Sequence, residues 1–72
     1  MDTSDYNVAA GIAANMADEA EAIKGYLELL KIIIDPEDKR IISEIISDEK
    51  NHSHLLRDMS LKYDGNIKEA AD

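Results

Sequence analysis

A carboxylate and an imidazole stand three residues apart in the stretch Glu49-Lys50-Asn51-His52. Within a helix, residues at this spacing lie on one face. Apolar residues at helical spacing surround the pair, which predicts that this face is buried: Ile42, Ile45, Ile46, Leu56 and Met59. A buried carboxylate is costly unless something compensates its charge. A metal ion would do so, because glutamate oxygens and a histidine nitrogen are ligands that iron, manganese and zinc accept.

Glu19 is a third candidate ligand, in an earlier stretch of the chain. At about 100° per residue, its direction is the centre of an apolar stripe that includes Val8, Ile12, Ile23 and Leu30. Tyr26 lies on the same line two turns later. Asp18 and Glu21 fall well off this line, so we expect them to be solvated. By the same criterion His54 points away from Glu49, and we do not count it as a ligand.

Two long helices carry these residues. The apolar spacing of three and four predicts one helix over about 5–34 and a second over about 37–63. Asp35-Pro36 separates them, because proline disfavours helix at the residue before it and is favoured in a new first turn. Asp64-Gly65-Asn66 is typical of a helix stop with Gly65 in the left-handed conformation, which leaves a short tail over 66–72.

An antiparallel hairpin of these helices would bring the candidate ligands to one level. At ~1.5 Å rise per residue, Glu19 lies ~24 Å from the turn and the Glu49–His52 pair lies ~20–24 Å from it. Nothing in the helical pattern alone requires this agreement. The fold class that we predict is therefore all-α, with residues 1–72 as a single helical-hairpin domain.

The composition sets limits on partners and location. A chain of 72 residues is near the size at which one core gives little stability. It has no cysteine, which excludes disulfides and cysteine-based metal sites. The formal net charge of −8 disfavours nucleic acid and anionic membrane as partners and favours cations. No signal peptide or membrane span is visible, so we expect a cytoplasmic protein.

One hairpin leaves each apolar stripe partly uncovered, and three ligands do not complete a two-metal site. A second copy related by a two-fold axis would solve both problems by forming a four-helix bundle. The bundle would hold one Glu from each of two helices and one Glu-x-x-His from each of the other two, which is the ligand set of di-iron and di-manganese carboxylate bundles.

Glu19, Tyr26 and Glu49-x-x-His52 together resemble the half-motif of the ferritin-like superfamily, which includes bacterioferritins and rubrerythrins. In layout the chain is most similar to the encapsulated ferritins, whose two-helix subunits form a di-iron ferroxidase site across a dimer interface and assemble as rings of dimers. The resemblance covers about residues 16–59. It implies that Glu19, Glu49 and His52 bind the metals and that Tyr26 places its hydroxyl near a ligand carboxylate.

The same resemblance implies a di-iron cofactor and ferroxidase activity, that is, oxidation of Fe(II), with self-association into a homodimer or a ring of dimers. The donor set also suits manganese or zinc. A location inside a protein shell would follow from the encapsulated relatives, although the tail over 67–72 is unlike their leucine-rich cargo peptide. No methionine stands where a bacterioferritin-like haem ligand would be expected.

Two other functions remain open at the level of sequence. The same residues could form a non-catalytic metal-binding site, or the chain could be an acidic helical oligomerisation module without metal. A lone Glu-x-x-His on a helix is common, and a lone glutamate on an apolar stripe is often a rim residue with a buried stem. The agreement of four residues in direction and height is what favours the metal site.

Overall fold

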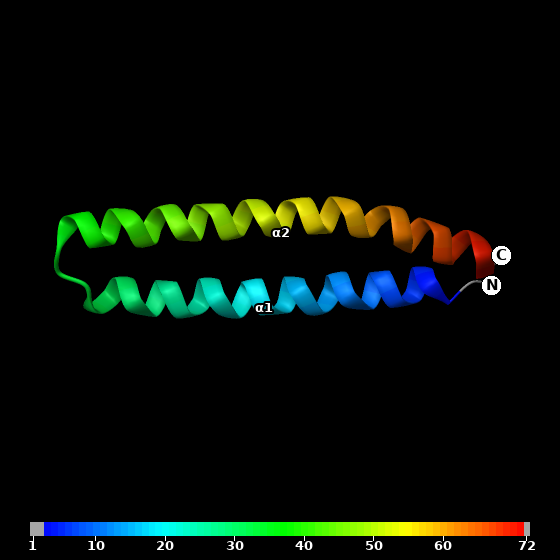
Figure 1. Cartoon of the computed structure of the whole chain (residues 1–72), viewed down its shortest axis with the longest axis horizontal. Coiled ribbons are helices and arrows are strands. Elements are labelled where there is room, and N and C mark those ends of the chain that lie inside the picture. Colours follow the sequence, from blue (N-terminus) through cyan, green and yellow to red (C-terminus); the bar gives the residue numbers. More distant parts are fainter. Residues whose placement is uncertain (1–2, 72) are drawn as a thin grey trace.

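The chain folds as an antiparallel pair of long helices, in a computed structural model that describes residues 3–71 and the side chains of residues 3–69. Helix α1 spans Ser4–Ile32 and helix α2 spans Pro36–Ala71, and the described residues contain no strand. The helices lie side by side along their whole length, with the connecting turn at one end and both chain termini at the other (Figure 1). The molecule measures 55 × 15 × 14 Å. The prediction of an all-helical, two-helix chain is confirmed.

Three residues, 33–35, connect the helices. α1 ends at Ile32, two residues earlier than predicted, and Ile33 has extended backbone with ψ 133° while its N–H still donates to the Leu29 carbonyl at 3.1 Å. Asp35 caps α2, because its carboxylate accepts a hydrogen bond of 2.9 Å from the Asp38 N–H. Pro36 opens the first turn, where the missing N–H costs nothing.

Helix α2 continues through Gly65, so the predicted helix stop at 64–66 is wrong. No glycine among the described residues has a positive φ. Ile67, beyond the expected stop, is half-buried. Continued packing against the first turns of α1 therefore outweighs the cost of about 0.5–1 kcal/mol for a glycine inside a helix. The segment predicted as a tail is the last part of α2 up to Ala71.

The core of the hairpin is one seam with a seven-residue repeat. Apart from Ala22 and Ile45, which lie beside the seam, the half-buried and buried positions of the two helices alternate in steps of four and three, as in a coiled coil. On α1 they are Asp5, Ala9, Ile12, Met16, Glu19, Ile23, Tyr26 and Leu30. On α2 they are Ile42, Ile46, Glu49, Ser53, Leu56, Ser60, Tyr63 and Ile67. Among the described side chains, Ile12 and Ile46 are the only buried apolar ones, so the seam is a thin core.

A single hairpin exposes more surface than a compact protein of its mass. Its accessible surface is 5283 Å². A typical folded monomer of 8.0 kDa would expose about 4,450 Å². Large apolar side chains contribute to the excess, among them Val8, Leu27, Leu29, Ile41, Leu55, Met59 and Leu61. The hairpin therefore has apolar surface available for a further packing partner.

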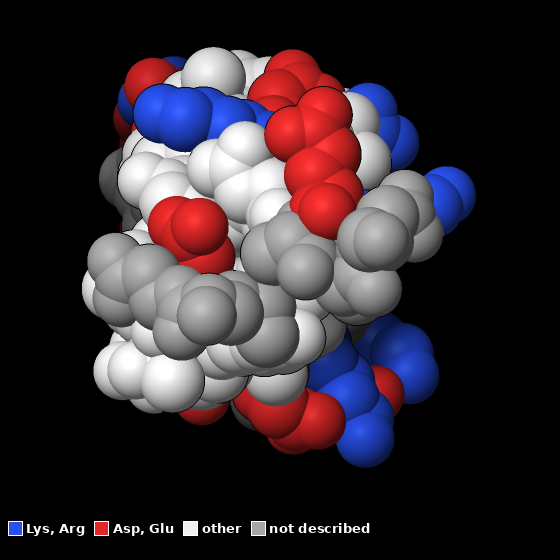
Figure 2. Space-filling view, turned by 90° about the vertical axis from the view of Figure 1, so that its right-hand side faces the viewer, with Lys and Arg blue, Asp and Glu red and all other residues white. Residues whose placement is uncertain are grey.

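Charged side chains surround the hairpin. Figure 2 looks along the long axis onto the end where the termini lie, and acidic and basic groups both appear on several sides of this end. The excess of acid is thus not gathered there into a single patch. Neither described helix contains a stretch long and apolar enough to cross a membrane.

Candidate metal site

The three predicted ligands meet near the middle of the hairpin. One oxygen each of Glu19 and Glu49 and one ring nitrogen of His52 lie within 4.8 Å of one another. Glu19 comes from the middle of α1, and Glu49 and His52 come from successive turns of α2. The agreement in height expected for an antiparallel hairpin is therefore present in the structure.

Glu19 is the centre of this group. Its side chain is only 20% exposed, and its Oε1 lies 3.8 Å from Nδ1 of His52. Its second oxygen, Oε2, accepts a hydrogen bond of 3.4 Å from the hydroxyl of Ser53. The two oxygens of Glu19 thus have different neighbours, one on the side of His52 and one within the seam.

The separations suit a shared cation. Two ligand atoms bound to one ion at about 2.1 Å can lie at most about 4.2 Å apart. The 3.8 Å between Glu19 Oε1 and His52 Nδ1 is within this limit. The widest separation in the group, up to 4.8 Å, would close with a small rotation of one side chain. The residues present therefore fit a metal ion in donor chemistry and in spacing.

His52 differs from expectation, because its side chain is 56% exposed rather than buried. It lies beside the seam instead of in it, immediately before the seam residue Ser53. Ile45 and Met59 lie in the same row, seven residues on either side, and Met59 is also exposed. The helical pattern identified this row as apolar, but one hairpin has nothing to cover it.

The row of His52 belongs to an open face of the hairpin. On each helix, the residues directly before every second seam position form a row beside the seam. In an antiparallel coiled coil, these rows of the two helices lie on the same side of the seam. This open face consists of Val8, Asn15, Ala22 and Leu29 on α1 and Ile45, His52, Met59 and Asn66 on α2, with Ile41 and Leu55 in the row beside the α2 members. Its large apolar members are half-buried or exposed, and the candidate ligands reach it at mid-length. The site therefore opens onto an uncovered, mainly apolar surface.

Tyr26 lies in the seam, half-buried, one seven-residue repeat after Glu19. Long side chains on a helix generally lean towards its N-terminus, so we expect Tyr26 to lean towards the level of Glu19. The implied contact between its hydroxyl and a ligand carboxylate stays a prediction.

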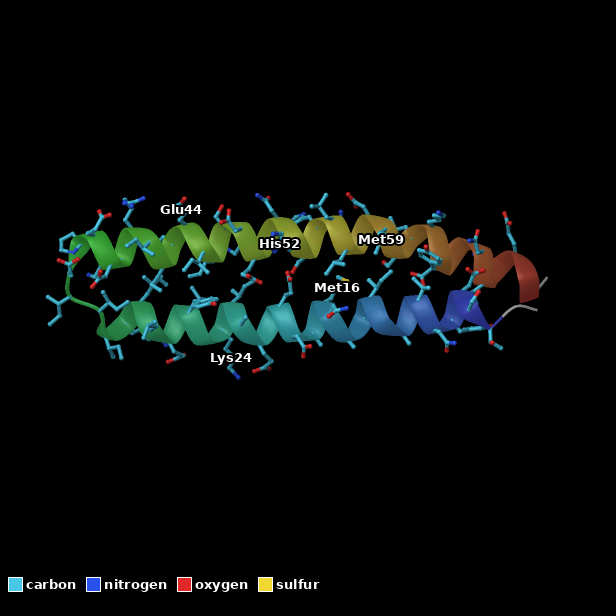
Figure 3. All side chains as sticks on the ribbon, viewed as in Figure 1. Met16, Lys24, Glu44, His52 and Met59 are labelled. Carbon is cyan, nitrogen blue, oxygen red and sulfur yellow. The ribbon has the colours of Figure 1, made fainter. Side chains whose placement is uncertain are left out.

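The residues set aside as solvated are exposed, as expected: Asp18, Glu21 and His54. His54 lies on the other side of the seam, where it lines a shallow depression of about 150 Å³ with Met16, Ser53 and Arg57. Figure 3 shows Met16 between the two helices, whereas Lys24 and Glu44 point away from the neighbouring helix. The sequence thus identified correctly which of the glutamates near the site face inwards, whereas it did not predict the exposure of His52.

Ser53 is a site residue that the sequence did not indicate. Its hydroxyl contacts Glu19 from the opposite helix. Its position could have drawn attention to it. Ser53 directly follows His52 and precedes Ser60 by seven residues, and both serines stand in an otherwise largely apolar row of the helix. A serine in a helix usually bonds to its own backbone, so this position alone did not predict a contact across the hairpin.

Comparison with known proteins adds no relative, since no family model, curated protein or solved structure matches the chain. The ferritin-like resemblance accordingly depends on Glu19, Tyr26, Glu49 and His52 themselves.

Proposed function

We propose that the chain is a di-iron carboxylate protein that oxidises Fe(II), with its site formed between two copies of the hairpin. The observation that carries the proposal is the convergence of Glu19, Glu49 and His52 from two helices to within 4.8 Å. Two carboxylates and one imidazole per chain are the donor set that suits iron.

The second copy follows from what one hairpin lacks. The three candidate ligands lie next to the open face, and the hairpin has apolar surface that it does not cover itself. A two-fold axis through this face would cover His52, Ile45 and Met59 and bring a second ligand set opposite the first. The combined set of four glutamates and two histidines matches that of di-iron bundles. Four carboxylates would also balance the four positive charges of two ferrous ions.

Fe(II) is the substrate in this proposal, and dioxygen or hydrogen peroxide is the oxidant. In the reaction with dioxygen, two ferrous ions give up one electron each, and dioxygen takes both electrons with two protons to become hydrogen peroxide. Glu19, Glu49 and His52 would hold the two ions close together, so that both electrons are delivered at one place. Anionic carboxylates favour the more highly charged ferric product over the ferrous substrate. Tyr26 would fix the orientation of a ligand carboxylate through its hydroxyl.

The test begins with anaerobic titration of Fe(II) into the purified protein. We expect one Fe(II) per chain, a mass that is a dimer or a multiple of it, and rapid loss of Fe(II) when air is admitted. Glu49→Ala and His52→Ala should lose tight binding. Glu21→Ala and His54→Ala are the matched controls, because these exposed residues lie on the same helices outside the group.

Each other outcome contradicts part of the proposal. Tight, stoichiometric metal without faster oxidation would indicate a non-catalytic metal-binding protein. Absence of stoichiometric binding of iron, manganese or zinc would leave an acidic helical oligomerisation module. Equal losses in Glu21→Ala and Glu49→Ala would show that the ligands have been assigned to the wrong face.

A further inference from the structure

We infer that Ser53 is a positioning residue for the metal site, one that fixes which oxygen of Glu19 faces the metal. The inference rests on the proposed function. Ser53 Oγ donates to Glu19 Oε2 at 3.4 Å, a long hydrogen bond that joins α2 to α1. With Oε2 engaged in this way, Oε1 is the oxygen on the side of His52, 3.8 Å from Nδ1.

The direction of the Ser53 hydroxyl is what makes this contact informative. Serines inside helices commonly satisfy their hydroxyl on a backbone carbonyl of the preceding turn. Ser60 does so: its hydroxyl donates to the Arg57 carbonyl at 2.7 Å. Ser53 occupies the same row one repeat earlier and is equally half-buried, yet its hydroxyl points across the seam to Glu19. The two serines therefore occupy equivalent positions in the repeat and have different partners.

The hydrogen bond has a consequence for metal binding. A glutamate carboxylate can rotate about its terminal bond, and an unrestrained Glu19 could present either oxygen, or both, to an ion. Ser53 restrains this rotation from inside the seam, where Glu19 is largely covered. Groups that orient a metal ligand in this way typically change metal affinity or activity by about 10–100-fold when they are removed.

Ser53 also restricts the coordination that Glu19 can offer. A carboxylate oxygen that accepts a hydrogen bond from a hydroxyl is a weaker metal donor than its free neighbour. Glu19 should therefore bind through Oε1 alone, leaving Glu49 as the carboxylate with both oxygens available. Removal of the hydroxyl should change the symmetry of the ligand field as well as the affinity.

The test uses Co(II) without oxidant, because its visible absorption reports coordination geometry and no turnover is needed. We expect Ser53→Ala to bind Co(II) about 10-fold or more weakly than wild type and to shift the visible bands. Ser60→Ala is the matched control and should bind within about twofold of wild type with an unchanged spectrum, since its hydroxyl bonds within its own helix.

A second pair of variants separates the hydroxyl from packing. Ser53→Thr and Ser53→Val have the same shape and differ only in the hydroxyl, so Thr should restore the wild-type spectrum and affinity and Val should not. Circular dichroism of each metal-free variant reports whether the hairpin still folds. Equal Co(II) binding by the Thr and Val variants would overturn the role of Ser53 and leave the metal site intact. Failure of the wild type to bind Co(II), Fe(II) or Mn(II) would overturn the proposed function and this role together.

Discussion

The carboxylate of Glu19 lies 3.8 Å from Nδ1 of His52, although the two residues belong to opposite helices and are 33 positions apart in the sequence. This distance is too long for a hydrogen bond. The antiparallel register places the two groups side by side without joining them directly. Glu49 is close to both, so the three side chains form a group that could hold a metal ion.

Neutralising Glu19 should reveal the charge repulsion within this group. Glu19→Gln keeps the size of the side chain and removes one negative charge beside Glu49. We expect the metal-free variant to melt at a higher temperature than metal-free wild type. With excess Fe(II) under anaerobic conditions we expect wild type to melt at the higher temperature, because metal binding to the native state stabilises wild type more than the variant. Thermal melts with chelator and then with metal would measure this.

Glu21→Gln is the control for that experiment, since Glu21 is exposed and lies outside the group. It should change the melting temperature little under either condition. A metal-free Glu19→Gln protein that melts well below wild type would show instead that the Glu19 carboxylate holds the hairpin together through Ser53.

Self-association should depend on one face of α2. Leu55 lies beside the α2 row of the open face and is 68% exposed, whereas Leu61 is 62% exposed on the other side of the seam. Leu55→Asp should convert the dimer to monomer at micromolar concentration, because a charge would be buried against the second copy. Leu61→Asp, with the same change at nearly equal exposure, should stay dimeric. The mass of each variant in solution tests this prediction. If Leu55→Asp stays dimeric and Leu61→Asp becomes monomeric, the interface lies on the side of the seam opposite the open face.

Gly65 lies inside a continuous helix with nothing within 4 Å of an added Cβ. Gly65→Ala should therefore stabilise the protein by about 0.5–1 kcal/mol, measured by denaturant unfolding. A loss of stability would mean that Gly65 needs a conformation that alanine cannot adopt. Gly25 is equally open in one hairpin, but it lies on the side of α1 next to the open face. We expect Gly25→Ala to gain less, because a second copy would approach it.

The start of α2 should respond to pH through Glu37. Arg40 donates hydrogen bonds to both oxygens of Glu37, at 2.7 and 3.1 Å, and lowers the pKa of Glu37 below its ordinary value of 4.5. Because the folded-state pKa is the lower one, the contribution of Glu37 to stability is present above pH 4.5 and is lost as the pH falls through the lowered pKa.

Arg40→Met removes this donor, so the pKa of Glu37 should move back up towards 4.5, as followed by NMR titration of the Glu37 side chain. The effect on global stability should be small, because both side chains are exposed and solvent screens the pair. An unchanged Glu37 pKa in the variant would show that the ion pair is absent in solution.

Much of the fold could be predicted because it depends on local signals. Apolar spacing predicted both helices, and Asp35-Pro36 predicted the break between them. The cap of α2 by the Asp35 carboxylate was not predicted. The helix stop at Gly65 was wrong because a local turn preference competed with a distant contact. Ile67 packs in the seam near the start of α1, and no local pattern around Gly65 contains that information.

The sequence predicted which residues come together at the candidate site, but not how exposed their side chains are. Direction and height identified Glu19, Glu49 and His52, since helical geometry fixes both. The exposure of His52 was not predicted, because the width of an apolar stripe does not reveal how many neighbouring helices cover it. Ser53 was missed since a hydroxyl has several partners within reach, and only the full packing selects one.

The unbroken seven-residue repeat of the seam restricts how the length of this chain can change. Deleting one residue from α1 between Glu19 and the turn would rotate Glu19 by about 100° relative to the turn and shift it by about 1.5 Å, away from His52. Removing seven residues from each helix on the turn side would shorten the hairpin by about two turns per helix and bring the same three side chains level again. Insertions and deletions on that side are therefore compatible with the site only as matched pairs of whole repeats, whereas the end carrying the termini can vary freely without moving a ligand.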